Sequence, residues 1–123
     1  MTKNKKSDPQ LQRLQTTIDY QFKQPALLEQ ALTHKSYSKD NNERLEFIGD
    51  AVLGYIVGCM LYRSYPEVQE DALSLMRAQL VRGATLAEIA QKLELSDCLR
   101  LGSGEAKSGG RSRASILADA VEA

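Results

Sequence analysis

The sequence has few of the residues that build soft-metal, redox or nucleophilic sites. Its 123 residues include one histidine, two cysteines and no tryptophan. Cys59 and Cys98 match neither a zinc spacing nor a disulfide framework, so we expect a chain from a reducing cytoplasm. His34 alone cannot build a softer-metal site, and we expect it to be a structural hydrogen-bonding residue. No Ser/His/Asp or Cys/His constellation is present, which argues against a side-chain nucleophile.

The chain also lacks net charge and a long hydrophobic run. Sixteen Lys and Arg residues balance sixteen Asp and Glu residues, so no global electrostatic attraction to a polyanion is expected, although a local one is possible. The longest uncharged apolar stretch, residues 51–62, is shorter than the roughly 20 residues that cross a bilayer. The charged N-terminus has no apolar core behind it and is not a secretory signal. These features predict one compact domain with no membrane partner.

What the sequence does contain is helical periodicity. No segment shows sustained period-two alternation, so the prediction is an all-α domain. Residues 1–10 are expected to be a basic flexible leader, although Asp8 and Pro9 form an N-cap and first-turn pair. A helix from 43 to about 62 is apolar nearly all round from residue 51, which predicts a central, buried helix. Gly83 is a stop signal for the helix before it, and residues 102–113 are expected to form a Gly- and Ser-rich loop.

Acidic residues recur at helical spacing in two places. Glu43, Glu46 and Asp50 lie at i, i+3 and i+7, which puts them on one face of a helix. Asp119 and Glu122 repeat the i, i+3 spacing near the C-terminus. Such like charges repel unless a cation neutralises them, and oxygen-only ligands select Mg²⁺ or Mn²⁺.

The same acids can also be explained without a metal ion. The helix macrodipole favours acids in a first turn, which accounts for Glu43 and in part for Glu46 without any metal. Asp119 and Glu122 have the spacing of an ordinary solvated helix face. Glu70, just before the helix expected from about residue 71, is a candidate sixth acid.

The identities of the residues around these acids are more informative than the spacing of the acids alone. Residues 42–53, NERLEFIGDAVL, closely resemble the signature of the ribonuclease III family, which cleaves double-stranded RNA. Four supporting blocks resemble the family in its order and at its spacings: LTHKS at 32–36, MRA at 76–78, LVRG at 80–83 and SILADAVEA at 115–123. The resemblance covers nearly the whole chain from about residue 11.

The resemblance implies a ribonuclease III-like helical endonuclease domain at residues 11–123 that works as a homodimer. Family members continue past the last signature helix and usually add a double-stranded-RNA-binding domain. We expect this chain to be cut short in that helix and to carry no such second domain. By position, the acids that match the Mg²⁺ ligands, with Mn²⁺ as substitute, are Glu46, Asp50, Asp119 and Glu122.

The resemblance also implies roles for single residues. Asp50 and Glu122 match catalytic acids, and Glu43 and Glu70 match acids that shape the cleavage site. Phe47 matches an apolar residue at the dimer contact.

The expected reaction is metal-assisted hydrolysis of double-stranded RNA, which leaves staggered ends with 5′-phosphate and 3′-hydroxyl groups. Lys107, Arg111 and Arg113 are candidates to hold the RNA backbone, with a solvated loop as the equal alternative. Ribosomal RNA processing and message decay are both compatible roles. The rival functions are a catalytically inactive RNA-binding relative and a helical interaction module, and the intact set of six acids argues against the first.

Overall fold

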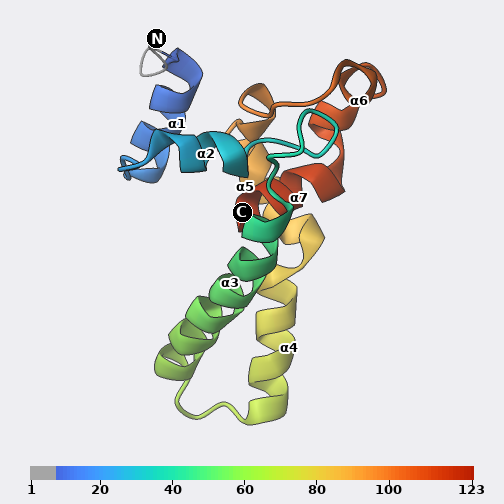
Figure 1. Ribbon diagram of the computed structural model, residues 1–123. Helices are drawn as coiled ribbons and strands as arrows, with labels where there is room; N and C mark the ends of the chain where they lie inside the picture. Colours follow the sequence, from blue (N-terminus) through green and yellow to red (C-terminus); the bar gives the residue numbers. More distant parts are fainter. Residues whose placement is uncertain (1–7) are drawn as a thin grey trace.

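The computed structural model describes residues 8–123 as an all-α domain, which confirms the predicted fold class (Figure 1). Within these residues the only β-type pairing is an isolated bridge between Thr33 and Arg100. The elements, in chain order, are α1 (Pro9–Ile18), α2 (Pro25–Ala31), α3 (Glu43–Ser64), α4 (Glu70–Val81), α5 (Gly83–Lys92), the 3₁₀ turn η2 (Leu95–Asp97), α6 (Ser103–Lys107), the 3₁₀ turn η3 (Gly110–Ser112) and α7 (Ala114–Glu122).

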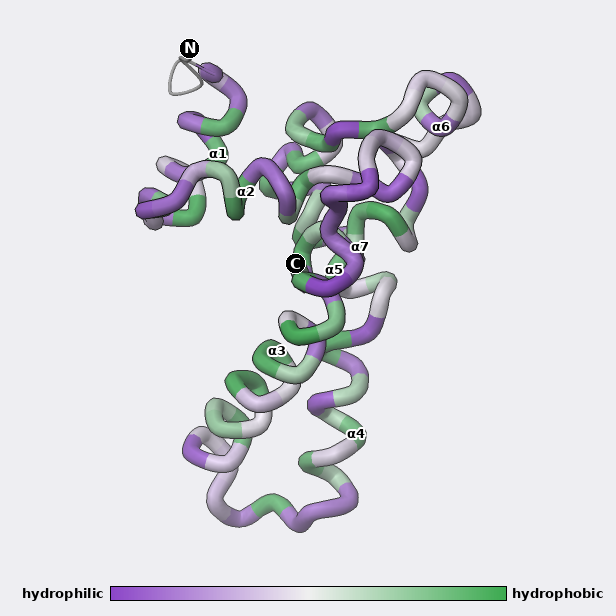
Figure 2. The backbone as a smooth tube through the Cα atoms, viewed as in Figure 1, coloured by the Kyte–Doolittle hydropathy of each residue, from purple (hydrophilic) through white to green (hydrophobic). Residues whose placement is uncertain are grey.

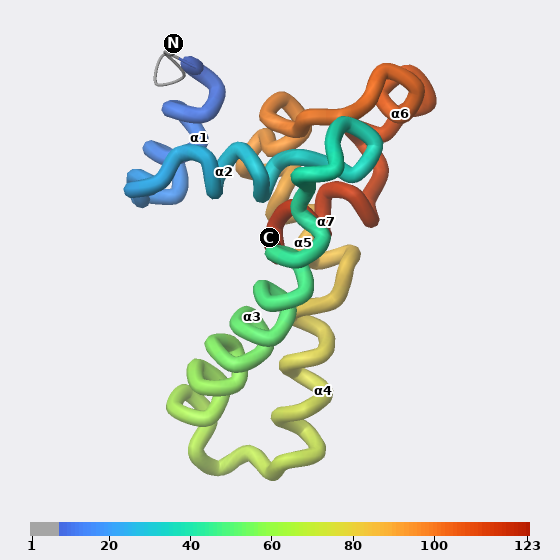
Figure 3. The backbone as a smooth tube through the Cα atoms, viewed as in Figure 1, coloured from blue at the N-terminus to red at the C-terminus, as the bar shows by residue number. Residues whose placement is uncertain are grey.

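The domain has a helical lobe from which α3 and α4 project as a hairpin (Figures 1 and 3). The lobe contains the hydrophobic core, in which α7 packs along α5 and residues of α1 and α2 cover one side. Ala90 of α5 and Leu117 of α7 are almost completely buried at the centre. The C-terminal end of α7 lies beside the first turns of α3 (Figure 1).

Helix α1 begins earlier than the expected leader allows. The Asp8 carboxylate accepts a hydrogen bond of 2.9 Å from the Gln10 amide, and Pro9 occupies the first turn. Pro9 and Gln10 therefore belong to a helix and not to a flexible leader. The rest of that predicted leader, residues 1–7, lies outside the described residues.

Two local expectations were wrong. Gly83 does not end the fourth helix but begins α5, because Arg82 alone, in an extended conformation, separates α4 from α5. Residues 102–113 are not a simple loop either, since they contain α6 and η3. Gly110 packs so closely on α6 that a Cβ there would lie 2.8 Å from the Glu105 carbonyl oxygen.

Helix α3 is not the buried central helix that its composition predicts. Only Leu61 is buried, and α3 packs on α4 along one side and on α7 at its N-terminal end. The hydropathy colouring shows apolar residues along the open side (Figure 2). The large hydrophobic side chains that α3 exposes are Phe47, Ile48, Val52, Tyr55, Ile56, Met60 and Tyr62.

The composition of α3 also bears on the membrane prediction. By length and composition alone, α3 is apolar enough to cross a membrane, although its longest uncharged run is short. Core helices of water-soluble proteins pass the same test, so the finding is weak evidence for a span. The acids Glu43, Glu46 and Asp50 in its first two turns favour an aqueous setting for that end.

The start of α3 is tied to the lobe through Asn42. Its side-chain amide donates to the carbonyl oxygen of Ala31 at 3.0 Å, and its backbone N–H donates to Thr33 at 2.9 Å. Asn42 is almost fully buried, so these bonds replace solvation that the amide loses on folding.

We expect Asn42→Ala to lower the free energy of unfolding by about 1–3 kcal/mol, because the Ala31 carbonyl would lose its buried partner. Urea denaturation followed by circular dichroism measures this change. Gln91→Ala, which removes an exposed side-chain amide of α5, serves as the control. A loss below about 0.5 kcal/mol at Asn42 would mean that water replaces the lost donor.

Candidate metal centre

The site forms where the first turns of α3 meet the last turn of α7. A glycine permits this contact: a Cβ at Gly49 would overlap the backbone carbonyl oxygen of Glu122 and would lie 2.7 Å from its carbonyl carbon. No side chain fits between the two helices here. Gly49 therefore sets the distance between the acids of α3 and those of α7.

Three carboxylates converge at this contact, one from α3 and two from α7. Glu46, Asp119 and Glu122 each offer a carboxylate oxygen, and these atoms lie within 4.8 Å of one another. All three residues are half-buried. Asp50, one turn along α3 from Glu46, is within hydrogen-bonding reach of Glu122. The structure thus brings together three of the four residues that the resemblance assigns to the metal, and the fourth, Asp50, lies beside Glu122.

The electrostatics of the cluster show an excess of negative charge. Burial first, then hydrogen bonding to Asp50 and repulsion from Asp50 and Glu46, raises the pKa of Glu122 to about 7. Burial and the charge of Glu46 also raise the pKa of Asp119, and the nearby basic side chains of His34 and Lys35 partly offset this rise. An oxygen-only donor set with uncompensated charge fits a hard divalent cation.

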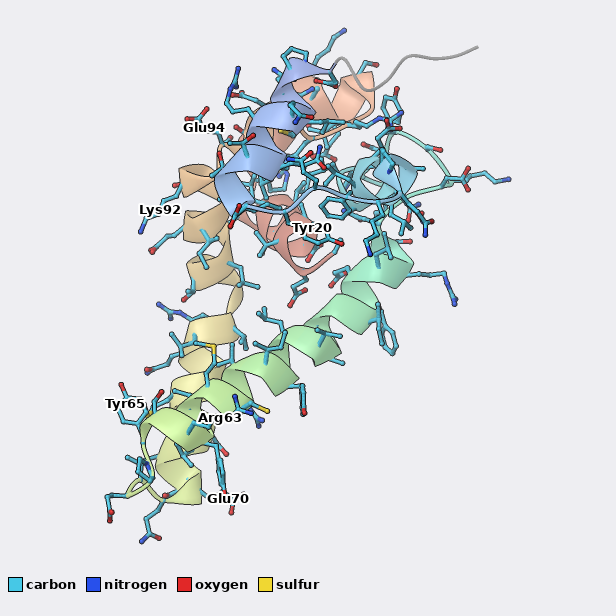
Figure 4. All side chains as sticks on the ribbon, turned by 90° about the vertical axis from the view of Figure 1, so that its left-hand side faces the viewer. Tyr20, Arg63, Tyr65, Glu70, Lys92 and Glu94 are labelled. Atoms are coloured by element: carbon cyan, nitrogen blue, oxygen red, sulfur yellow. The ribbon has the colours of Figure 1, made fainter. Side chains whose placement is uncertain are left out.

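The two further predicted acids, Glu43 and Glu70, are not part of the three-carboxylate cluster. Glu43 begins α3, and its charge contributes to the raised pKa of Asp119, but its side chain is exposed and pairs with Lys35 at 3.9 Å. Glu70 begins α4 at the far end of the hairpin, away from the lobe (Figure 4). One chain therefore does not bring Glu70 to the cluster. Phe47 is 80% exposed on α3 and makes no core contact.

Two of the three candidate RNA-binding cations are engaged within the fold. Arg111 donates from Nη1 to the carbonyl oxygens of Ser96 and Leu99, each at 2.8 Å. Arg113 pairs with Glu105 at 3.1 Å and also donates to a backbone carbonyl. Lys107 is exposed and forms no ion pair among residues 8–123. Of the three, Lys107 is the one whose side chain makes neither a hydrogen bond nor an ion pair among residues 8–123.

Sequence reasoning missed two features of the site. The close approach at Gly49 was not predicted, although a glycine inside a helix is a signal for such contacts. The hydrogen bonds of His34 were expected only in general terms, because the Ser36 hydroxyl beside the ring is also bonded to Gly102, which is far away in the chain.

Sequence comparison relates this site to known proteins. The profile of the family described as ribonuclease-III-like matches residues 24–123. A ribonuclease 3 from Chromobacterium violaceum is 57% identical over 116 residues, which cover 94% of this chain and 49% of that protein. A ribonuclease 3 from Bordetella petrii is 58% identical over 113 residues, or 92% of this chain and 45% of that protein. The chain thus spans about half the length of these curated relatives.

The fold agrees with solved structures. Two structures of the nuclease domain of ribonuclease III from Campylobacter jejuni superpose with TM-scores of 0.89 and 0.87, each at 44% sequence identity. Both cover 91% of this chain, and the chain covers 79% and 77% of theirs. With the profile match over most of its length, the chain belongs to the ribonuclease-III-like family.

Proposed function

We propose that this chain is the endonuclease domain of a ribonuclease III that hydrolyses double-stranded RNA with Mg²⁺. The observation that carries the proposal is the convergence of Glu46, Asp119 and Glu122 from α3 and α7 in a chain of this family. These carboxylates would hold the ion, with Asp50 beside Glu122. Mn²⁺, which takes similar ligands, is the expected substitute.

The bound ion would lower the pKa of a water and polarise the scissile phosphate. The protein side chains then have separate tasks. Glu46 of α3 and Asp119 of α7 would hold the ion at the contact between the two helices. Glu122, whose pKa is about 7 without metal, would give up its proton when it binds the ion, and Asp50 is its hydrogen-bond partner in the empty cluster. The products would be 5′-phosphate and 3′-hydroxyl ends.

We further propose that the active form is a homodimer joined through the exposed side of α3. That side is rich in unpartnered hydrophobic side chains, which mark protein–protein contacts. One of the Campylobacter jejuni structures is described as flexible in a region involved in dimer formation. In a dimer, Glu70 of one subunit would join Glu43 and the metal ligands of the other, so that each site cuts one strand and leaves staggered ends.

Phe47→Ala should shift the sedimentation coefficient toward that of the monomer, because an 80% exposed phenylalanine gains burial only from a partner. Sedimentation velocity at equal concentrations measures the shift. Leu27→Ala, which truncates an exposed hydrophobic residue of α2, is the matched control and should behave as the parent. Identical mass for all three proteins would argue against Phe47 as the contact.

The cleavage itself is tested with a duplex RNA on a denaturing gel. We expect cleavage in Mg²⁺, none in EDTA, and none with Asp119→Asn. Lys23→Gln, far along the chain from the cluster, controls for nonspecific loss. Binding without cleavage in any divalent ion would favour an inactive RNA-binding relative, and neither binding nor cleavage would favour a helical interaction module. We propose a cytoplasmic role in RNA processing, including that of ribosomal RNA, and decay.

A further inference from the structure

The imidazole of His34 is held on one edge by a turn between α2 and α3. Its Nδ1 accepts a hydrogen bond of 3.1 Å from the Ser36 backbone N–H and lies 2.8 Å from the Ser36 hydroxyl. That hydroxyl oxygen in turn accepts the Gly102 N–H at 2.9 Å. Because a backbone N–H only donates, Nδ1 is an acceptor, and the neutral ring carries its proton on Nε2.

The backbone around the ring is also fixed. The His34 N–H donates to the Arg100 carbonyl at 3.0 Å, and the His34 carbonyl accepts from the Tyr37 N–H at 2.9 Å. Gly102 approaches so closely that a Cβ there would overlap the Ser36 carbonyl oxygen. The ring cannot turn Nδ1 outward without losing its bonds to Ser36, so the direction of Nε2–H is set by the fold.

This fixed donor lies beside the acidic cluster. His34 follows Thr33, whose carbonyl accepts the N–H of Asn42, the residue that precedes α3. The ring is among the groups that lower the pKa of Asp119, so it lies within electrostatic range of that carboxylate in α7. Among residues 8–123 no protein acceptor is hydrogen-bonded to Nε2, and the side chain is only half-buried. The neighbouring Lys35 is already paired with Glu43.

We propose that His34 is a substrate-binding residue that donates its Nε2–H to a non-bridging phosphate oxygen of the RNA strand held at the acidic cluster. This inference rests on the proposed function. Phosphate oxygens are acceptors only, and a strand drawn to a divalent ion at Glu46, Asp119 and Glu122 would bring them next to this unpaired donor. The contact positions the strand and reads no base.

Two substitutions separate this role from a structural one. His34→Asn keeps a polar atom at the place of Nδ1, where it can bond Ser36, but has none at the place of Nε2. His34→Gln reaches the place of Nε2 with an amide donor and gives up the bond to Ser36. We expect His34→Ala and His34→Asn to weaken duplex RNA binding and raise KM by about 5- to 10-fold, with kcat little changed. His34→Gln should stay within about twofold of the parent in both quantities.

Binding is measured by fluorescence anisotropy with a labelled RNA duplex in Ca²⁺ in place of Mg²⁺, so that the acidic cluster keeps all its carboxylates, and a gel of the same samples checks that the duplex is uncut. Thermal unfolding of each variant reports the turn separately, and there His34→Asn should match the parent better than His34→Gln. Full RNA binding by His34→Asn with loss in His34→Gln would overturn the proposal and leave a structural histidine. Parent-like binding by all three variants would overturn it as well. If the protein with His34 intact neither binds nor cuts the duplex, the proposed function itself has failed.

Discussion

Gly49→Ala should reduce Mg²⁺-dependent RNA cleavage by at least about 100-fold, although the substitution adds one methyl group. The added Cβ would overlap the carbonyl oxygen of Glu122, so α3 and α7 must move apart. That movement separates Glu46 and Asp50 from Glu122, and a displacement of about 1 Å is enough to disturb a metal site. Single-turnover cleavage of a duplex RNA in Mg²⁺ measures the loss.

The same methyl group should lower the free energy of unfolding by about 1–3 kcal/mol, as overpacking does in a close helix contact. Gly83→Ala is the matched control, because a Cβ at the start of α5 meets nothing within 4 Å. That control should keep full cleavage and gain a few tenths of a kcal/mol from helix propensity. Parent-like cleavage by Gly49→Ala would show that the helix contact does not position the acids.

The acids show how far the sequence alone could go. The i, i+3 spacings correctly put Glu46 and Asp50 on one face of a helix, and Asp119 and Glu122 on one face of another. Spacing says nothing about whether acids more than 60 residues apart in the chain meet. The family signature supplied that expectation, and the contact at Gly49 supplies its physical cause.

Helix α3 shows where hydropathy misleads. An apolar composition on all sides indicates a surface that is unfavourable in water, but not what covers it. The single chain buries only Leu61 fully and leaves residues such as Phe47 and Tyr55 open. The sequence therefore predicted that the apolar surface of α3 is covered, and the proposed second subunit would cover it.

The basic residues of the 102–113 segment show another limit of sequence reasoning. A guanidinium group binds backbone carbonyls as readily as phosphates, since both are oxygen acceptors. Arg111 joins η3 to the carbonyls of Ser96 and Leu99, which are neighbours only after folding. No local pattern distinguishes that partner from RNA.

Glu122→Gln should have opposite effects on stability and activity. In the folded, metal-free protein the pKa of Glu122 is about 7, above its ordinary value of 4.5, so the folded state binds more protons than the unfolded state between these pH values. The free energy of unfolding contributed by this group therefore falls as pH rises from about 4.5 to 7. Glutamine carries no charge and removes that loss.

We expect metal-free Glu122→Gln to be more stable than the parent by about 1 kcal/mol at pH 8, since partial solvent exposure screens the repulsion, and equal to it at pH 4. Urea denaturation in EDTA measures this difference. Cleavage in Mg²⁺ should fall by about three orders of magnitude, because a metal ligand is lost. Mg²⁺ should stabilise the parent and have little effect on the variant.

Glu88→Gln, on the exposed side of α5, is the control for replacing any glutamate, and its stability should follow that of the parent at both pH values. If Glu122→Gln were less stable than the parent at pH 8 without metal, the carboxylate would be a favourable structural group. Repulsion among the acids of the metal-free cluster would then not destabilise the fold. A gain in stability together with the loss of cleavage is the combination expected of a metal ligand, because the repulsion that destabilises the empty cluster is what attracts the ion.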